Sequence, residues 1–233
     1  MKHTHLFLFI CIILFSGCHT GKIENVENVS FSTDTNTLIA SVERNLTTMG
    51  TFPPSDMDND LRYSTADSTL DMLADLVNIY HFDLKRFKEL DRSCFQNDAV
   101  SFYFFSVNCA CSSPPVYSIL VWKTPSGPKA RKWGWSERPR FVSEINKKNG
   151  LYLLVMSEKL SGSEYLNTAQ VIQLSADTLF LEYPAFEDKT RLSVTNGVFS
   201  YDTLNRILTC HSIDSANAIS LSMKFDGTRF QSE

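Results

Sequence analysis

The chain has 233 residues, of which 43% are hydrophobic and 12% aromatic, enough for a folded domain with a buried core. Its 22 lysines and arginines are outnumbered by 26 acidic residues, and the formal net charge is -4. Nucleic acid is therefore excluded as a partner, because neutralising phosphates requires a clustered excess of basic residues.

The N-terminus has the composition of an export signal. Lys2 precedes an apolar run of about ten residues, Leu6 to Phe15, which ends in Ser16-Gly17-Cys18. This run is too short to cross a bilayer core of about 30 Å as a helix. The pattern predicts a cleaved signal peptide and not a membrane span.

The segment Leu14-Phe15-Ser16-Gly17-Cys18 resembles the lipobox of bacterial lipoproteins, in which the cysteine is acylated and becomes the first residue of the mature chain. The resemblance covers this segment alone. It implies a signal peptide over residues 1–17, a lipid anchor on Cys18 and a place in the cell envelope of a Gram-negative bacterium. His19, in place of aspartate, implies sorting to the outer membrane. An ordinary cleaved signal without lipid is the alternative.

Residues 18–33 are rich in Gly, Asn, Ser, Thr and Glu and are too polar to pack. They are expected to form a flexible tether with a reach of roughly 20 Å. The tether would hold a single domain, residues 34–233, close to the membrane surface.

Residues 34–92 contain two helical patterns. Apolar residues at helical spacing predict a short amphipathic helix that ends at Gly50. A longer pattern, from Ser68 to about Leu90, has acidic residues in its first half and basic residues in its second, which suits the helix dipole. Its wide apolar face is expected to lie against a sheet.

Residues 98–233 change to short strand-like segments at spacings of about 8–12 residues. Leu151 to Met156 is apolar on both faces and is expected to be a central strand. Turn dipeptides between such segments predict hairpins. They are Asn149-Gly150, Ala176-Asp177, Asn196-Gly197 and Asp226-Gly227.

The predicted fold class is therefore α+β. N-terminal helices, in residues 34–92, are expected to pack on a predominantly antiparallel β-meander of about ten strands, in residues 98–233. No sequence repeat of fixed length indicates a propeller or a solenoid.

Four cysteines fall in the domain, namely Cys94, Cys109, Cys111 and Cys210. An exported, oxidising compartment favours disulfides among them. Because Cys109 and Cys111 flank one residue at a strand end, their side chains should point apart, and pairing with Cys94 or Cys210 is expected. A thiolate metal site is not expected, because the one close pair has a gap of a single residue.

Tryptophan and basic residues cluster between residues 117 and 141, a segment that also holds Tyr117, Arg138 and Arg140. Rings beside cations can stack on sugars or hold an anionic ligand, although core residues with a basic rim would give the same pattern. The candidate ligand patch consists of Trp122, Trp133, Trp135, Arg131 and Lys132.

No metal or cofactor is expected elsewhere. Asp56, Asp58 and Asp60 have the spacing that opens a calcium loop, but Leu61 stands where the sharp turn needs glycine. A solvated acidic loop is the better interpretation.

Two classes of function remain. The favoured one is a lipid-anchored, non-catalytic envelope module that binds a protein or a glycan. The competing class is a hydrolase acting on cell-wall or dietary glycans. One route for it is a Cys210 or serine nucleophile served by His81 or His211. Another is a glycosidase pair of acids, although almost any domain of this size has enough of them; here they are Glu144, Glu158, Glu164, Glu182 and Glu187. A concave pocket that unites Cys210, His211 and a carboxylate would favour the hydrolase, and an exposed aromatic patch would favour the binding module.

Overall fold

A computed structural model describes residues 35–51, 59–93, 99–109, 114–175, 177–212 and 220–233. The chain from Asp34 to Glu233 forms one compact unit. Several predicted features lie outside the described residues: the signal peptide, the tether, Cys18, Cys94, Cys111, Asp56 and Asp58. Within the described part, no helix is long and apolar enough to cross a membrane.

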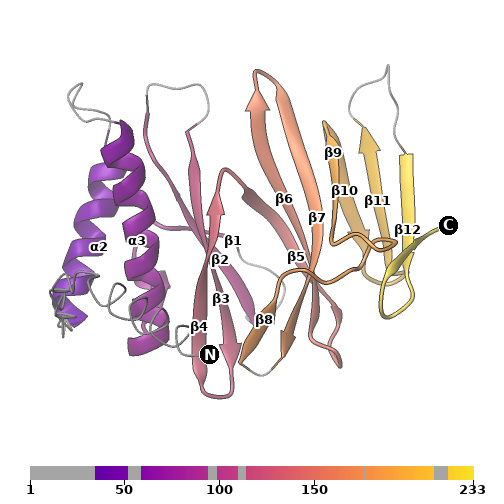
Figure 1. Cartoon of the computed structure of the whole chain (residues 1–233), viewed down its shortest axis with the longest axis horizontal. Coiled ribbons are helices and arrows are strands. Elements are labelled where there is room, and N and C mark those ends of the chain that lie inside the picture. Colours follow the sequence, from indigo (N-terminus) through magenta and orange to yellow (C-terminus); the bar gives the residue numbers. More distant parts are fainter. Residues whose placement is uncertain (1–34, 52–58, 94–98, 110–113, 176, 213–219) are drawn as a thin grey trace, which may run out of the picture. The chain divides into compact units, whose positions relative to one another are not determined.

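The described part contains two α-helices and thirteen β-strands (Figure 1). The helices are α2 (Thr35–Gly50) and α3 (Asn59–Tyr80). Sheet A is formed by β1 (Asp91–Ser93), β2 (Val100–Ser106), β3 (Val116–Thr124) and β4 (Gly127–Trp135). Sheet B is formed by β5 (Arg138–Asn146), β6 (Leu151–Ser161), β7 (Glu164–Ser175) and β8 (Thr178–Phe180), and β9 (Arg191–Thr195) also pairs with β7. Sheet C is formed by β10 (Gly197–Asp202), β11 (Ile207–Ser212), β12 (Ser220–Phe225) and β13 (Phe230–Ser232).

The α+β class is confirmed, but the strands form three antiparallel sheets and not one meander of about ten strands. Within each sheet, consecutive strands are neighbours, apart from β9. Alternation of apolar and polar residues identifies strands, but it does not mark where the chain leaves one sheet and begins the next.

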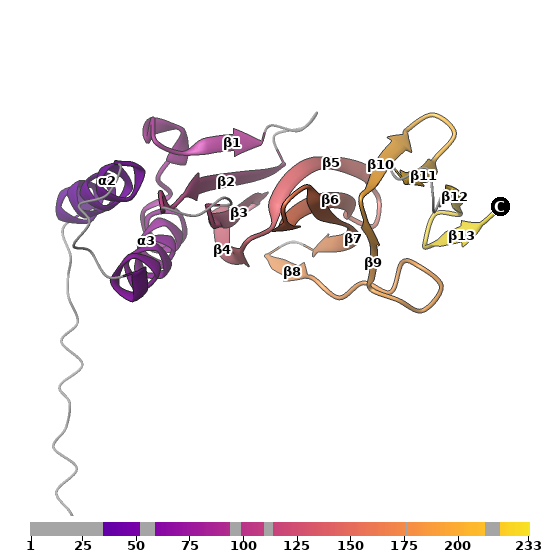
Figure 2. The same ribbon diagram turned by 90° about the horizontal axis from the view of Figure 1, so that it is seen from above.

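The helices and sheets A, B and C follow one another in chain order (Figure 2). Three hydrophobic cores join them. The first core lies between the helices and sheet A and includes Leu73. The second joins sheet A to sheet B and includes Phe102 and Leu154. The third joins sheet B to sheet C and includes Leu153 and Phe225. Sheet B is thus covered on both faces.

The predicted central strand is confirmed. β6 lies between β5 and β7, and its residues from Leu151 to Ser157 are all buried. Neighbouring side chains on a strand point to opposite faces, so a continuous apolar run fits a strand that has a core on either side.

The short helix α2 ends at Gly50 as predicted, but α3 begins and ends earlier than the predicted segment of Ser68 to Leu90. At the end of α3, the His81 N–H donates to the Val77 carbonyl at 3.1 Å, and the Phe82 N–H donates to the Leu76 carbonyl at 3.0 Å. The bond from His81 to Val77 is that of an αL-type helix end, in which His81 lies in the left-handed region with a φ of 52°. Glycine is usual at that position, so the stop was not visible in the sequence.

Predicted hairpins are confirmed at Asn149-Gly150 and Asp226-Gly227, which join β5 to β6 and β12 to β13. β7 and β8, on either side of Ala176-Asp177, also pair antiparallel. Gly150 has a φ of 63°, and a Cβ there would lie 2.0 Å from the carbonyl oxygen of Leu174. Only glycine fits this turn.

Asn196 and Gly197 form a corner and not the predicted hairpin. β9 pairs with β7 in sheet B, whereas β10 pairs with β11 in sheet C, so the chain changes sheets between them. The Asn196 N–H donates to the Tyr165 carbonyl at 2.7 Å, which anchors the corner on β7. A Cβ on Gly197 would lie 2.6 Å from Val194 Cγ1 and 2.8 Å from Cys210 Sγ, so no side chain fits.

Candidate binding cleft

A cavity of about 1100 Å³ lies where the first half of α3, the start of β3, the link between β4 and β5, and the β6–β7 hairpin approach one another. We call it the Tyr-Arg cleft, after the lining residues Tyr63, Tyr117, Tyr165, Arg138 and Arg140. Aromatic and cationic side chains from distant parts of the chain therefore line a single concavity.

Tyr117 is 7% exposed, and its ring stacks on Phe105 with centroids 5.7 Å apart. Burial raises the pKa of its hydroxyl, and the nearby Tyr63 and Asp67, which line the same cavity, raise it further. The hydroxyl thus stays protonated at neutral pH. No described group forms a hydrogen bond with it, and Tyr117 belongs to the lining of the cleft, so the hydroxyl keeps its capacity to donate.

The two arginines of the cleft are held differently. The Arg138 guanidinium lies over the Phe104 ring, 5.1 Å from its centroid, and 3.8 Å from an Asp91 oxygen. Arg140 Nη2 donates to Ser157 Oγ at 3.4 Å, and no described carboxylate lies within ion-pair distance of it. Because a guanidinium has five N–H donors, Arg140 retains most of its capacity to bind an anion.

The acidic residue Asp67 also lines the cleft, but its charge is compensated. Lys132 Nζ lies 3.1 Å from Asp67 Oδ2 and 2.8 Å from Asp71 Oδ1. This ion-pair network of three residues links β4 to α3. The other charged residues of the lining are the basic Arg138, Arg140 and Lys159 and the acidic Glu158, so positive charge predominates in the cleft.

A second cavity, of about 820 Å³, adjoins the Tyr-Arg cleft. Arg140, Ser157 and Tyr165 line both cavities, and the second adds Asn167 and Asn196. We call it the amide chamber. Beside the apolar residues Val155, Val198 and Phe199, its lining offers the amide groups of Asn167 and Asn196 and the hydroxyl group of Ser163, none of which lines the cleft.

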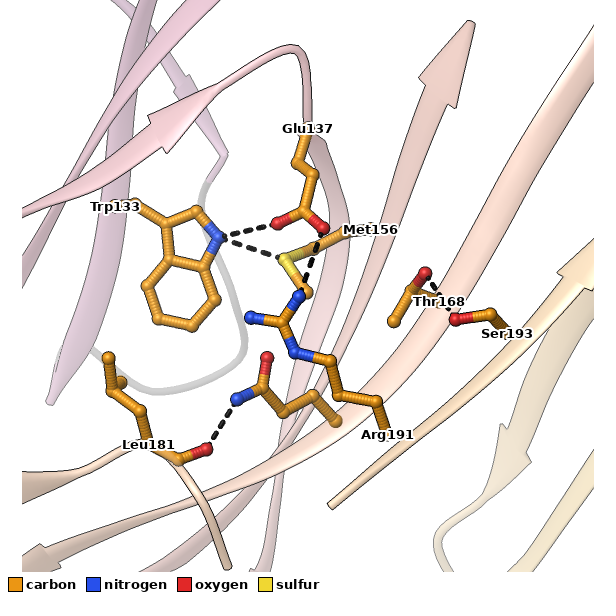
Figure 3. Close-up of polar contacts among 8 residues, drawn as sticks. Trp133, Glu137, Met156, Thr168, Leu181, Arg191 and Ser193 are labelled. Atoms are coloured by element: carbon orange, nitrogen blue, oxygen red, sulfur yellow. Dashed lines mark hydrogen bonds and ion pairs between the residues drawn. The ribbon is translucent and has the colours of Figure 1, made fainter. Parts of the chain in front are cut away.

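A polar cluster behind the cleft fixes the link between β4 and β5 (Figure 3). The Trp133 indole N–H donates to Glu137 at 3.1 Å and faces Met156 Sδ at 3.0 Å, and Arg191 lies 3.5 Å from the other Glu137 oxygen. Glu137 therefore connects Trp133 of sheet A to Arg191 of β9 in sheet B, and Trp133 itself contacts Met156 of β6. Since Arg138 follows Glu137 directly, this cluster also fixes the backbone position from which the Arg138 side chain reaches the cleft.

Buried polar groups continue this cluster across sheet B. Thr168 and Ser193 share a hydrogen bond of 3.0 Å between β7 and β9, and the Gln170 amide donates to the Leu181 carbonyl (Figure 3). Gln170 is 1% exposed, and its Oε1 has no partner among the described residues. These bonds hold the segment between β8 and β9 against the sheet.

The predicted tryptophan patch is not one surface. Trp122 is 6% exposed in the core between sheets A and B, and Trp133 packs edge-on against Phe102 in the same layer. Lys132 lies on the opposite face of β4, beside α3, and Arg131 is exposed. The side chain of Trp135 lies outside the described part. The alternative interpretation, of core residues with a basic rim, fits Trp122 and Trp133.

The cleft draws on residues that the sequence pattern placed near the patch, together with others that it did not reveal. Tyr117, Arg138 and Arg140 come from the predicted aromatic and basic segment. Tyr63 and Tyr165 lie far from it in the chain, on α3 and β7, and only long-range packing brings them to the same cavity. No local signal distinguished these two tyrosines.

The cysteines do not form the catalytic group that the competing hydrolase would use. Cys210 is a free, fully buried thiol whose pKa is raised by burial, so the expectation that it takes part in a disulfide is wrong. His211, the next residue on β11, is exposed on the opposite face. Cys109 is buried and disulfide-bonded, with a partner outside the described residues.

Among the described residues, no group of three or more His, Cys, Asp or Glu side chains is placed to hold a metal ion. Comparisons of the chain with protein-family models, with curated proteins and with solved structures find no match.

Proposed function

We propose that this protein is a non-catalytic binding module whose ligand occupies the Tyr-Arg cleft. The observation that carries the proposal is the convergence of Tyr63, Tyr117, Tyr165, Arg138 and Arg140 on one cavity of about 1100 Å³. Concave sites lined by aromatic rings, with a few well-placed polar groups, are the usual form of small-ligand sites.

The ligand that fits this lining best is a glycan with negative charge. A tyrosine ring offers a flat apolar face to a sugar ring, and its hydroxyl adds a hydrogen bond. A guanidinium binds a carboxylate through two parallel N–H groups. Arg140 is suited to that role because no described carboxylate neutralises it.

The competing hydrolase has less support. Its predicted nucleophile Cys210 is buried in the core between sheets B and C, and His211 points away from it. A thiol without an adjacent base or solvent access is a poor nucleophile.

The lipobox resemblance supports a place for this module in the cell envelope. We propose that Cys18 carries the lipid and that the domain faces the periplasm or the outside from the outer membrane, where disulfides are favoured. Glycans are abundant ligands in that location, which agrees with the proposed chemistry of the cleft.

Binding to a panel of neutral and acidic oligosaccharides tests the function. The full chain is expected to bind acidic members, and Arg140→Ala to weaken that binding by about tenfold or more, because it removes a charge-assisted contact. Lys148→Ala, in the exposed β5–β6 turn, is the matched control and should bind like the unaltered protein. Release of new reducing ends, or equal binding by Arg140→Ala, would contradict the proposal.

Metabolic labelling with palmitate tests the anchor. The native chain is expected to take up label and fractionate with the outer membrane, whereas Cys18→Ala should remain unlabelled. Unlabelled native protein that retains its N-terminal methionine would remove the envelope part of the proposal and leave the cleft chemistry untouched.

A further inference from the structure

We infer that the Tyr-Arg cleft and the amide chamber together bind one extended acidic oligosaccharide, with a carboxylate-bearing sugar at Arg140 and neighbouring units on either side. This inference rests on the proposed function, since it names the class and length of the ligand. The supporting observation is that three residues line both cavities.

The two cavities share part of their lining at the β6–β7 strands and β5. Arg140, Ser157 and Tyr165 line both of them. The cleft alone, at about 1100 Å³, is slightly larger than the roughly 300–1000 Å³ that is usual for small-molecule sites. A single sugar would leave most of this space filled with water, whereas a chain of sugars fills both cavities.

Arg140 lies at the junction of the two cavities and not at either end. Its Nη2 donates a hydrogen bond to Ser157 Oγ at 3.4 Å, and this bond orients the guanidinium. A carboxylate bound there belongs to an internal unit of the ligand, because space for further units extends in both directions.

The two ends of the site differ in chemistry. The cleft contributes the exposed ring of Tyr63, the hydroxyl of Tyr117 and the charge of Arg138. The amide chamber contributes Asn167 and Asn196, whose NH₂ groups are suited to the hydroxyls of a sugar.

Asn196 is fixed rigidly enough to serve as a contact. Its Oδ1 accepts the Tyr165 N–H at 2.9 Å, and its own N–H donates to the Tyr165 carbonyl at 2.7 Å. Its NH₂ group has no partner among the described residues, and the Tyr165 ring that it braces borders both cavities.

Calorimetry with the full acylated chain in mild detergent tests the inference. The probes are galacturonic acid, its dimer and its hexamer, hyaluronan oligosaccharides of matching lengths, and a neutral galactan hexamer. An acidic hexamer is expected to bind about tenfold more tightly than its dimer and than the neutral hexamer, because it reaches both cavities.

Two variants separate the cavities. Asn167→Ala, which alters the amide chamber alone, should reduce the affinity for the hexamer to that for the dimer and leave the dimer unaffected. Arg140→Ala should weaken both. Asn149→Ala, in the exposed β5–β6 turn, is the matched control and should change neither.

The outcomes distinguish this inference from the proposed function. Equal affinity for dimer and hexamer, or no effect of Asn167→Ala, overturns the extended site while binding in the cleft stands. Binding of an acidic peptide but of no saccharide, lost in Arg140→Ala, overturns the glycan class. No binding of any probe overturns both proposals.

Discussion

Asp226 organises the β12–β13 turn through a single carboxylate. Its Oδ1 accepts the N–H groups of Thr228 at 2.7 Å and Arg229 at 2.9 Å, and its Oδ2 accepts the Gln231 amide at 2.8 Å. These bonds favour the charged form and lower the pKa of Asp226 to about 2. The group is exposed, so its contribution to stability is moderate and comes from the turn geometry.

This lowered pKa predicts a pH-dependent contribution to stability. The carboxylate is charged in both folded and unfolded chains above the ordinary value of 3.8, so its contribution is complete there and is lost as pH falls towards 2. Asp226→Ala should lower the free energy of unfolding at neutral pH by about 1 kcal/mol, a difference that shrinks between pH 4 and 2 in urea titrations.

Asp75→Ala, on the exposed face of α3, serves as the control and should show no such pH-dependent difference. A deficit for Asp226→Ala that stays constant down to pH 2 would show that the carboxylate charge is not what stabilises the turn.

At the scale of elements, the corner between β9 and β10 depends on Gly197, which has no side chain. Gly197→Ala is expected to lower the free energy of unfolding by about 1–3 kcal/mol, because the new methyl group would overlap Val194 and Cys210. Denaturant unfolding measures the loss. Gly50→Ala, where nothing lies within 4 Å of the added Cβ, should have almost no effect. Equal stability of the two variants would contradict the prediction.

The Glu137 cluster predicts an effect on both stability and binding. Glu137→Ala removes the carboxylate that joins Trp133 to Arg191, and should lower the free energy of unfolding by about 1–3 kcal/mol while shifting the Trp133 fluorescence. Arg191→Ala breaks only a half-exposed ion pair and should cost less than about 1 kcal/mol. Equal losses in the two variants would mean that the contact to Trp133 adds nothing.

The two Asn-Gly dipeptides show how far local sequence determines an element. Asn149-Gly150 and Asn196-Gly197 have the same turn chemistry, yet the first closes a hairpin and the second turns the chain into another sheet. The difference comes from β9, which pairs with β7 and not with the strand that follows it. Strands and turns were therefore predictable one by one, but their pairing partners were not.

At the scale of the whole described unit, sheet B lies between two cores, and β6 is hydrogen-bonded on both sides. Amide hydrogens from Leu151 to Val155 are expected to exchange most slowly, because they open only when both cores separate. Those of the edge strand β13 should exchange much faster. Hydrogen exchange followed by mass spectrometry measures this, and β6 exchanging as fast as β13 would contradict the arrangement of the layers.

The packing of the layers on one another explains why the site was only partly predictable from the sequence. The aromatic and basic segment was recognised, and it does supply Tyr117, Arg138 and Arg140 to the cleft. Its residues Trp122 and Trp133 instead pack in the core between sheets A and B. No local sequence pattern indicates that a second sheet covers that face of sheet A. Tyr63 and Tyr165 entered the site through contacts between layers, which carry no local pattern.

Each layer is also a continuous stretch of chain, with the helices first and sheets A, B and C after them. Strand pairing is therefore mostly local, and the nascent polypeptide can complete one sheet before the next emerges. In a chain halted after β4, Phe102 and Leu120 would be exposed to water. This hydrophobic surface would be prone to aggregation, and a chaperone would have to shield it until β6 is synthesised. The order of synthesis thus matters most at the step from sheet A to sheet B.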